Sequence, residues 1–254
     1  MRAITSEIAS QPTLWRKAAA MAPAVVGRLP APGEPAVAIG CGTSHHIARA
    51  YAVLREENGL GLTDAAIASE FPPHRSYGRV VAISRSGTTT EVLRTLEGLK
   101  GRVATVAVTA VPDSPVASSA DESVVLDFAN EQSVVQTRFA TTALTLLRAH
   151  IGDRLEAAIA DGEAASAWTE AYPAMEYRHG PISVAGPRTL VWAIGPVDPG
   201  VLADVADTGA TIIGQGLDPM AELVLIQRVA VELAEACGLD PDRPKHLTRS
   251  VVLP

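Results

Sequence analysis

Short apolar runs that each end in a polar, glycine-containing loop are the feature that most constrains the fold of this 254-residue chain. The runs cover residues 36–40, 78–84 and 102–109. A strand buried on both faces of a parallel sheet has this length and this continuous apolar character. Apolar residues at helical spacing follow two of the runs, within 41–59 and 89–101. This alternation of strand and helix predicts an α/β fold with a parallel sheet.

The same pattern divides the chain into two halves. We expect a first domain at residues 1–152, which begins with a helix over 5–27, and a second, shorter domain at 153–254 that includes the C-terminal tail. The other expected strands cover 63–70, 121–128, 188–196 and 210–216, and the other expected helices cover 131–152, 154–168, 199–209 and 219–238. Both halves run strand, helix, strand, long helix.

Composition limits the class of function. Apolar residues make up 47% of the chain and charged residues 19%, which is enough apolar material for a core. The net charge of −7 argues against general binding to nucleic acid or anionic membranes. Two cysteines are too few for a disulfide framework, and no apolar stretch reaches the roughly 20 residues of a membrane span. We therefore expect a cytoplasmic protein with no nucleic-acid or membrane partner.

Two loops carry more hydrogen-bonding groups than a turn needs. The stretch "SRSGTTTEV" (84–92) follows the second apolar run, and "GCGTSHH" (40–46) follows the first. Each combines glycine with hydroxyls and leads into the N-terminus of an expected helix, where backbone amides attract anions. In parallel sheets, ligands bind beyond the carboxyl ends of the strands. The loops predict a phosphate site, although capping and turn formation also favour these residue types.

Five motifs in one order resemble a known family. They are "CGTSHHIARAYA", "SRSGTTTEVLRTL", "EQSVVQTRFATTAL", "EYRHGPISV" and "DPDRPKHLTRSVVLP". Together they resemble the SIS (sugar isomerase) family, and most of all the isomerase module of glucosamine-6-phosphate synthase and the stand-alone hexosamine-6-phosphate deaminase/isomerases. The resemblance implies a flavodoxin-like three-layer sandwich repeated twice, which binds a hexose 6-phosphate without metal or cofactor. It also implies a homodimer whose sites are shared between subunits.

The resemblance also assigns site residues. Those that match phosphate and sugar contacts are Gly42, Thr43, Ser44, Ser84, Arg85, Ser86 and Thr89, with Val134 and Gln136 lining the same pocket. Glu163 matches the base that moves a proton between C1 and C2 of the open-chain sugar. His179 matches the histidine that opens the sugar ring, and Arg249 stands where the synthase module has a lysine.

Departures from the family pattern keep other functions open. The second half lacks about one βα unit ahead of Glu163, and Arg249 is a poor imine-forming group because arginine stays protonated. These departures favour an alternative, a non-catalytic module that binds or senses a sugar phosphate. A third possibility is an isomerase of pentose phosphates, although the tail resembles the hexosamine enzymes better. No glutaminase domain is recognisable, so we do not expect a complete glutamine-dependent synthase.

Three further residues near the first loop have simpler interpretations. His45 and His46 are adjacent, so they cannot share a helical face as metal ligands do, and we expect them at a pocket rim or in packing. Cys41 precedes a helix N-terminus, where a thiol can become reactive. We interpret it as a small buried residue.

Overall fold

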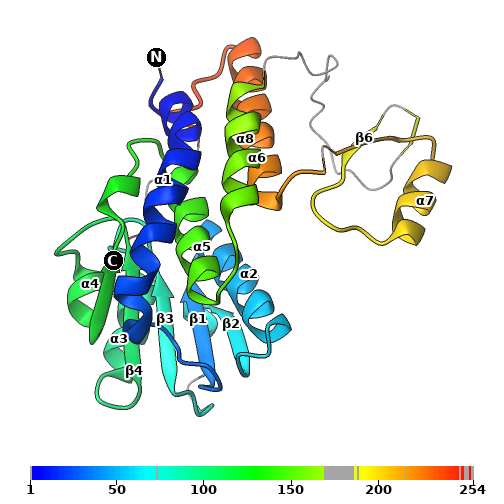
Figure 1. Ribbon diagram of the computed structural model, residues 1–254. Helices are drawn as coiled ribbons and strands as arrows, with labels where there is room; N and C mark the ends of the chain where they lie inside the picture. The colour runs from blue at the N-terminus through cyan, green and yellow to red at the C-terminus, as the bar shows by residue number, and fades with distance from the viewer. Residues whose placement is uncertain are drawn as a thin grey trace. The chain divides into compact units, whose positions relative to one another are not determined.

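The computed structural model describes residues 2–72, 74–168, 186–187, 189–214, 216–245, 247–248 and 252 (Figure 1). The chain divides into two compact units. The first contains residues 1–155 and 240–254, and the second contains residues 156–239. The break along the chain is therefore close to the predicted one at 152/153, but the C-terminal tail groups with the first unit.

The first unit contains a five-stranded sheet in the order β2-β1-β3-β4-β5 (Figure 1). The strands are β1 (Ala36–Gly40), β2 (Thr63–Ile67), β3 (Arg79–Ile83), β4 (Ala104–Thr109) and β5 (Glu122–Val125). All neighbouring pairs run parallel. This is the flavodoxin-like, doubly wound order. The predicted α/β fold with a parallel sheet is confirmed.

Helices cover both faces of this sheet. The helices of the unit are α1 (Ala3–Val25), α2 (Thr43–Glu57), α3 (Thr90–Leu99), α4 (Pro115–Ser119) and α5 (Arg138–His150), with short 3₁₀ turns η1 (Val26–Arg28), η2 (Ala68–Glu70) and η3 (Asp127–Ala129). The first, second and fifth α-helices share one core cluster with the sheet, and α3 and α4 share the other. No helix within the described ranges is both long and apolar enough to cross a membrane.

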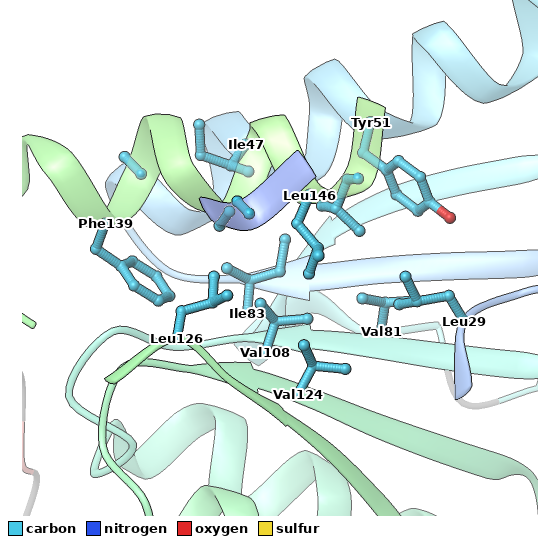
Figure 2. Close-up of a cluster of buried hydrophobic side chains, with 14 of the residues drawn as sticks. Leu29, Ile47, Tyr51, Val81, Ile83, Val108, Val124, Leu126, Phe139 and Leu146 are labelled. Atoms are coloured by element: carbon cyan, nitrogen blue, oxygen red, sulfur yellow. The ribbon is translucent and has the colours of Figure 1, made fainter. Parts of the chain in front are cut away.

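Alternation along the strands explains the two cores. On β3, Val81 and Ile83 belong to the cluster beneath α1, α2 and α5, where Figure 2 shows them facing Leu146. The intervening Val80 and Ala82 belong to the cluster beneath α3 and α4. Successive side chains of a strand point to opposite faces, so a strand between two helical layers must be apolar throughout. The continuous apolar runs in the sequence reflect this double burial.

One helix of the first unit starts later than predicted, and another was not predicted. The helix expected from residue 131 begins at Arg138, because the carboxylate of Glu131 accepts the backbone amides of Thr137 and Arg138. Those amides are the first donors of α5, so the preceding residues form a loop folded around its cap. The short helix α4 was not expected. Ser114 caps it through the amide of Ala117, and Pro115 occupies its first position.

The second unit is smaller. Its elements are α6 (Glu156–Ala167), β6 (Leu190–Trp192), α7 (Pro199–Asp207), β7 (Thr211–Ile213) and α8 (Pro219–Ala236). The two strands pair in parallel. Arg228 of α8 donates to the carbonyls of Ala165 (2.7 Å) and Trp168 (2.6 Å), which joins α8 to the C-terminal end of α6. The helices α7 and α8 are capped by Asp198 and Asp218, whose carboxylates accept backbone amides of the first turn.

Candidate functional site

The two hydroxyl-rich loops leave neighbouring strands at the same edge of the sheet. Strands β1 and β3 pair in register, with Ile39 opposite Ala82, so their last residues Gly40 and Ile83 lie side by side. From this point the chain passes through α2 to β2 on one side and through α3 to β4 on the other. A reversal of this kind is the usual ligand position in a doubly wound sheet.

The loop after β1 brings the N-terminus of α2 close to the sheet. A Cβ atom at Gly40 would lie 2.7 Å from the backbone carbonyl carbon of Ser44, so only glycine permits this approach. Gly42 has a φ of +55° and is the N-cap residue of α2, with no side chain to cap the helix. Gly42 and Thr43 are exposed, whereas Ser44 is buried. The start of α2 therefore presents backbone amides and a hydroxyl at the sheet edge.

The loop after β3 is folded by its own hydroxyls. The side chains of Ser84 and Thr89 share a hydrogen bond of 3.2 Å across the loop. The hydroxyl of Ser86 accepts the amide of Thr88 at 3.3 Å and its hydroxyl at 3.1 Å. Thr89 is the N-cap residue of α3 but makes no side-chain cap hydrogen bond. The 84–89 loop is thus held in shape by hydrogen bonds among its own hydroxyls and amides.

Gly87 fixes the bend of this loop. Its φ is +66°, a backbone conformation that residues with a side chain rarely adopt. A Cβ atom there would overlap Ser114 and would lie 3.2 Å from the hydroxyl of Thr109. The carbonyl of Gly87 accepts the amide of Val116 at 2.9 Å, which joins the loop to α4.

Arg85 points into the protein. Its side chain is 1% exposed and lies 3.4 Å from the carboxylate of Glu131, which is itself fully buried. It also donates to the backbone carbonyl of Ser133 at 3.1 Å. The guanidinium therefore ties the 84–89 loop to the 131–137 loop, and its charge is balanced by a carboxylate. Direct contact between Arg85 and a ligand remains a prediction, while its burial indicates a structural role.

The 131–137 loop carries the other two predicted pocket residues. Val134 and Gln136 are half-buried. The Oε1 atom of Gln136 is buried and has no hydrogen-bond partner among the described residues. A buried amide oxygen without a partner is costly, so a ligand hydroxyl or a water is the natural donor to it.

Burial raises the pKa of Glu131 above its usual range, although the hydrogen bonds from Thr137 and the charge of Arg85 oppose this effect.

The residues flanking the first loop agree with their simpler interpretations. His45 lines an open hollow of about 390 Å³ with Arg49, Asp64 and other residues of α2 and the β2 edge. His46 is exposed. Cys41 is half-buried, and burial together with the charge of Glu91 raises the pKa of its thiol. A raised pKa keeps the thiol protonated, which disfavours nucleophilic chemistry.

None of the three predicted catalytic residues belongs to the loops of the first unit. Glu163 is exposed on α6, in the second unit. His179 and Arg249 lie outside the described residues. The structure therefore brings together the binding residues of the first unit and leaves the catalytic assignments as predictions.

Sequence reasoning missed the buried acids behind the loops. Glu131 stands in the quoted "EQSVVQT" motif but was not singled out, and Glu7 of α1 was not considered. Both side chains are buried and bond the 131–137 loop. For Glu7 the available signal was an acid beside Ile4 and Ile8 on the apolar face of the expected helix, which is unusual unless the acid has buried partners.

Comparison with known proteins agrees with this description. Residues 35–152 match the SIS domain. The isomerizing glutamine–fructose-6-phosphate aminotransferase of Sulfurisphaera tokodaii is 26% identical, over 87% of this chain and 50% of its own length. The enzyme of the same name from Aeropyrum pernix is 29% identical, over 41% of this chain and 22% of its own length. The chain thus spans half or less of the length of these curated relatives.

Solved structures share the fold over nearly the whole chain. Glucosamine-6-phosphate deaminase from Thermotoga maritima superposes with a TM-score of 0.76 and 21% identity, covering 99% of this chain and 100% of that chain. The C-terminal domain of glucosamine-fructose-6-phosphate aminotransferase from Francisella tularensis gives a TM-score of 0.68 and 17% identity, covering 96% and 98%. At these identities the likeness shows the fold alone.

The fold is that of a doubly wound α/β protein, with two hydroxyl- and glycine-containing loops at the point where the strand order reverses. More particularly, residues 35–152 match the SIS domain, which confirms the resemblance for the three motifs that lie within this segment.

Proposed function

We propose that this chain binds a sugar 6-phosphate at the β1–β3 edge and catalyses its metal-independent aldose–ketose isomerisation, with or without loss of ammonia. The observation that carries the binding half is the pair of adjacent loops. Two helix N-termini without side-chain caps, at Gly42 and Thr89, lie beyond neighbouring strands together with the hydroxyls of Ser84 and Ser86. A phosphate dianion needs several donors of this kind.

The charges of the 84–90 segment are compatible with a bound phosphate that is not held by an arginine side chain. The 84–90 segment contains no acid, and its one cation, Arg85, is already balanced by Glu131. In our proposal the phosphate is held by hydroxyls and backbone amides, and Gln136 accepts a sugar hydroxyl through its buried Oε1 atom. An amino-sugar 6-phosphate such as glucosamine 6-phosphate is the favoured substrate, because the names of both the curated relatives and the structural neighbours refer to this chemistry.

The catalytic half follows the family pattern. Glu163 is the proposed base that transfers a proton between C1 and C2, and His179 is the proposed ring-opening residue. Arg249 is proposed to lie near the sugar carbonyl. The site is proposed to be completed by a second copy of the chain in a homodimer. A carboxylate and a proton shuttle at oxygen are sufficient for this reaction, so no metal or cofactor is invoked.

A non-catalytic binding module is the second candidate. One observation favours it: the proposed binding loops all belong to the first unit, so they need no residue of the second unit for their own structure. Ligand binding therefore does not need the catalytic assignments to be correct.

The first experiment separates these two functions. Purified protein is mixed with glucosamine 6-phosphate in D₂O and followed by NMR. Deuterium at C2, or fructose 6-phosphate with ammonium, is the expected result for an isomerase. Broadening of the ligand's NMR lines without deuterium exchange would instead support the non-catalytic binding module.

The loops are tested with the double variant Ser86→Ala/Thr89→Ala. Removing two hydroxyls that face the proposed phosphate should weaken sugar-phosphate binding by about ten-fold or more, at roughly 1–1.5 kcal/mol for each lost hydrogen bond. Isothermal titration calorimetry measures the change. Thr95→Val is the matched control, because Thr95 lies further along α3 and bonds the carbonyl of Ala68. Equal affinity in the double variant and the wild type would exclude this loop as the phosphate site.

A further inference from the structure

Glu7 is a buried acid that serves a distant loop. Its side chain is 2% exposed, and it accepts the backbone amides of Gln132 at 2.5 Å and Ser133 at 3.4 Å. It also accepts the hydroxyl of Ser133. Arg138 lies 4.0 Å from the same carboxylate and supplies an opposite charge. A carboxylate is rarely buried unless it is hydrogen-bonded and paired, and here most of the bonds hold residues 132 and 133.

The bonds of Glu7 continue into the phosphate-binding loop. Ser133, which Glu7 holds by its amide and hydroxyl, offers its carbonyl to the guanidinium of Arg85 at 3.1 Å. Arg85 stands between Ser84 and Ser86, so its buried side chain anchors the 84–89 loop to the 131–137 loop. A continuous set of contacts thus runs from α1 through the 131–137 loop to the proposed phosphate site.

The second end of the 131–137 loop is held independently. Glu131 accepts the amide of Thr137 at 2.6 Å and its hydroxyl at 2.7 Å, and it pairs with Arg85. The loop is therefore fixed near both ends by carboxylates, and Val134 and Gln136 lie between them. Two acids balance two arginines in this cluster, so burial of each charge is offset by its neighbours.

We propose that Glu7 is a positioning residue of the sugar-phosphate site, which fixes the 131–137 and 84–89 loops relative to each other through Ser133 and Arg85. This inference rests on the proposed function, since it takes the two loops as the ligand site. In this proposal α1 helps to set the affinity for the sugar phosphate, although none of its residues is predicted to contact the ligand.

The test compares Glu7→Ala, Glu7→Gln and Gln11→Ala. Gln11 is the matched control: it lies one turn further along α1, is fully buried, and bonds Thr141 of α5 instead of the loop. Calorimetric titration with glucosamine 6-phosphate and with fructose 6-phosphate gives the affinity, and thermal unfolding gives the stability. We expect Glu7→Ala to weaken binding by about ten-fold or more, as for loss of charged hydrogen bonds.

The conservative variant separates positioning from simple destabilisation. Glu7→Gln keeps the shape and one acceptor, so affinity should return to within about three-fold of the wild type. Gln11→Ala should lower the melting temperature while affinity stays within about three-fold. Equal loss of affinity in Gln11→Ala and Glu7→Ala would overturn the proposal. If Glu7→Ala does not fold, Ser133→Ala replaces it, because that variant keeps the amide contacts and removes only the hydroxyl, which bonds Glu7 and the carbonyl of Val135.

Hydrogen exchange keeps this test separate from that of the function. If the wild type binds neither sugar phosphate, the proposed function fails, whatever Glu7 does. Amide exchange in the free protein then decides the coupling. Faster exchange at residues 132–137 and 84–89 in Glu7→Ala, but not in Gln11→Ala, supports the contacts described. Unchanged exchange at 84–89 overturns them.

Discussion

Replacing Gly87 with alanine tests whether the geometry of the 84–89 loop creates the binding site. Two effects act together at this position. The φ of +66° is unfavourable for any residue with a Cβ atom. The added methyl would also overlap Ser114, because it would lie closer to the Ser114 side chain than the 3.0 Å below which Cβ contacts are essentially never seen. Because Ser114 caps α4, the overlap cannot be relieved without moving that helix or the loop.

The magnitude follows from these two effects. The left-handed backbone conformation costs about 1–2 kcal/mol for a residue with a side chain. Forcing an extra methyl into a packed region costs about 1–3 kcal/mol. Gly87→Ala should therefore lower the free energy of unfolding by about 2–5 kcal/mol, a large part of the roughly 5–15 kcal/mol available to a domain. Sugar-phosphate affinity should fall as well, because the loop must move away from Ser114.

Urea unfolding and calorimetric titration measure the two consequences, and two other glycines act as controls. Gly152 has a φ of +86° with open space around it, so Gly152→Ala should show the backbone cost of about 1–2 kcal/mol alone. Gly98 lies within α3 with nothing within 4 Å, so Gly98→Ala should stabilise by about 0.5–1 kcal/mol. Neither should change affinity.

A second substitution identifies the overlap. Ser114→Gly removes the atoms that the new methyl would meet, so Gly87→Ala/Ser114→Gly should recover part of the affinity lost in Gly87→Ala. The reasoning would be refuted if Gly87→Ala were no less stable than Gly152→Ala. It would also be refuted if Gly87→Ala bound the sugar phosphate as tightly as the wild type.

Two further predictions concern the remaining titratable residues. Glu163→Gln should abolish deuterium exchange at C2 of the sugar while binding persists, whereas Glu156→Gln, another exposed acid of α6, should leave both unchanged; exchange at the wild-type rate in Glu163→Gln would place the base elsewhere. Burial lowers the pKa of His150 from its ordinary 6.5, so below that pH the unfolded chain takes up a proton that the folded chain does not, and stability falls as pH falls. In His150→Phe, urea unfolding at about pH 8 and pH 5.5 should show a weaker loss, and an unchanged pH dependence would exclude this histidine as its source.

The centre of the sheet was predictable because strands β1, β3 and β4 are buried on both faces. Residues 36–40 form β1 as expected, since a short run of apolar residues between glycine- and proline-containing loops has few other structures open to it. The loops after β1 and β3 were predictable for a related reason. Their glycines and hydroxyls are adjacent in sequence, so a local pattern was sufficient to find them, and the strand order then brought them together.

The buried cluster behind the site was not predictable in this way. Glu7 and Ser133 are 126 positions apart in the sequence. No local sequence pattern links an acid on one helix to a loop so distant along the chain. A different set of bonds, between residues six and seven positions apart, explains why the helix predicted from residue 131 starts later. Glu131 takes amides that would otherwise belong to an extra helical turn, and helical spacing alone cannot reveal such competition.

The capping residues of the two units have a consequence for stoichiometry. In the second unit, the carboxylates of Asp198 and Asp218 cap α7 and α8, whereas α2 and α3 of the first unit begin at Gly42 and Thr89 without a side-chain cap. An anion approaching α7 or α8 would meet a negative charge already in place. Although both halves alternate strand and helix, they are not equivalent receptors. If the proposed function is correct, the described residues offer a phosphate site at α2 and α3 of the first unit and no equivalent site at α7 or α8.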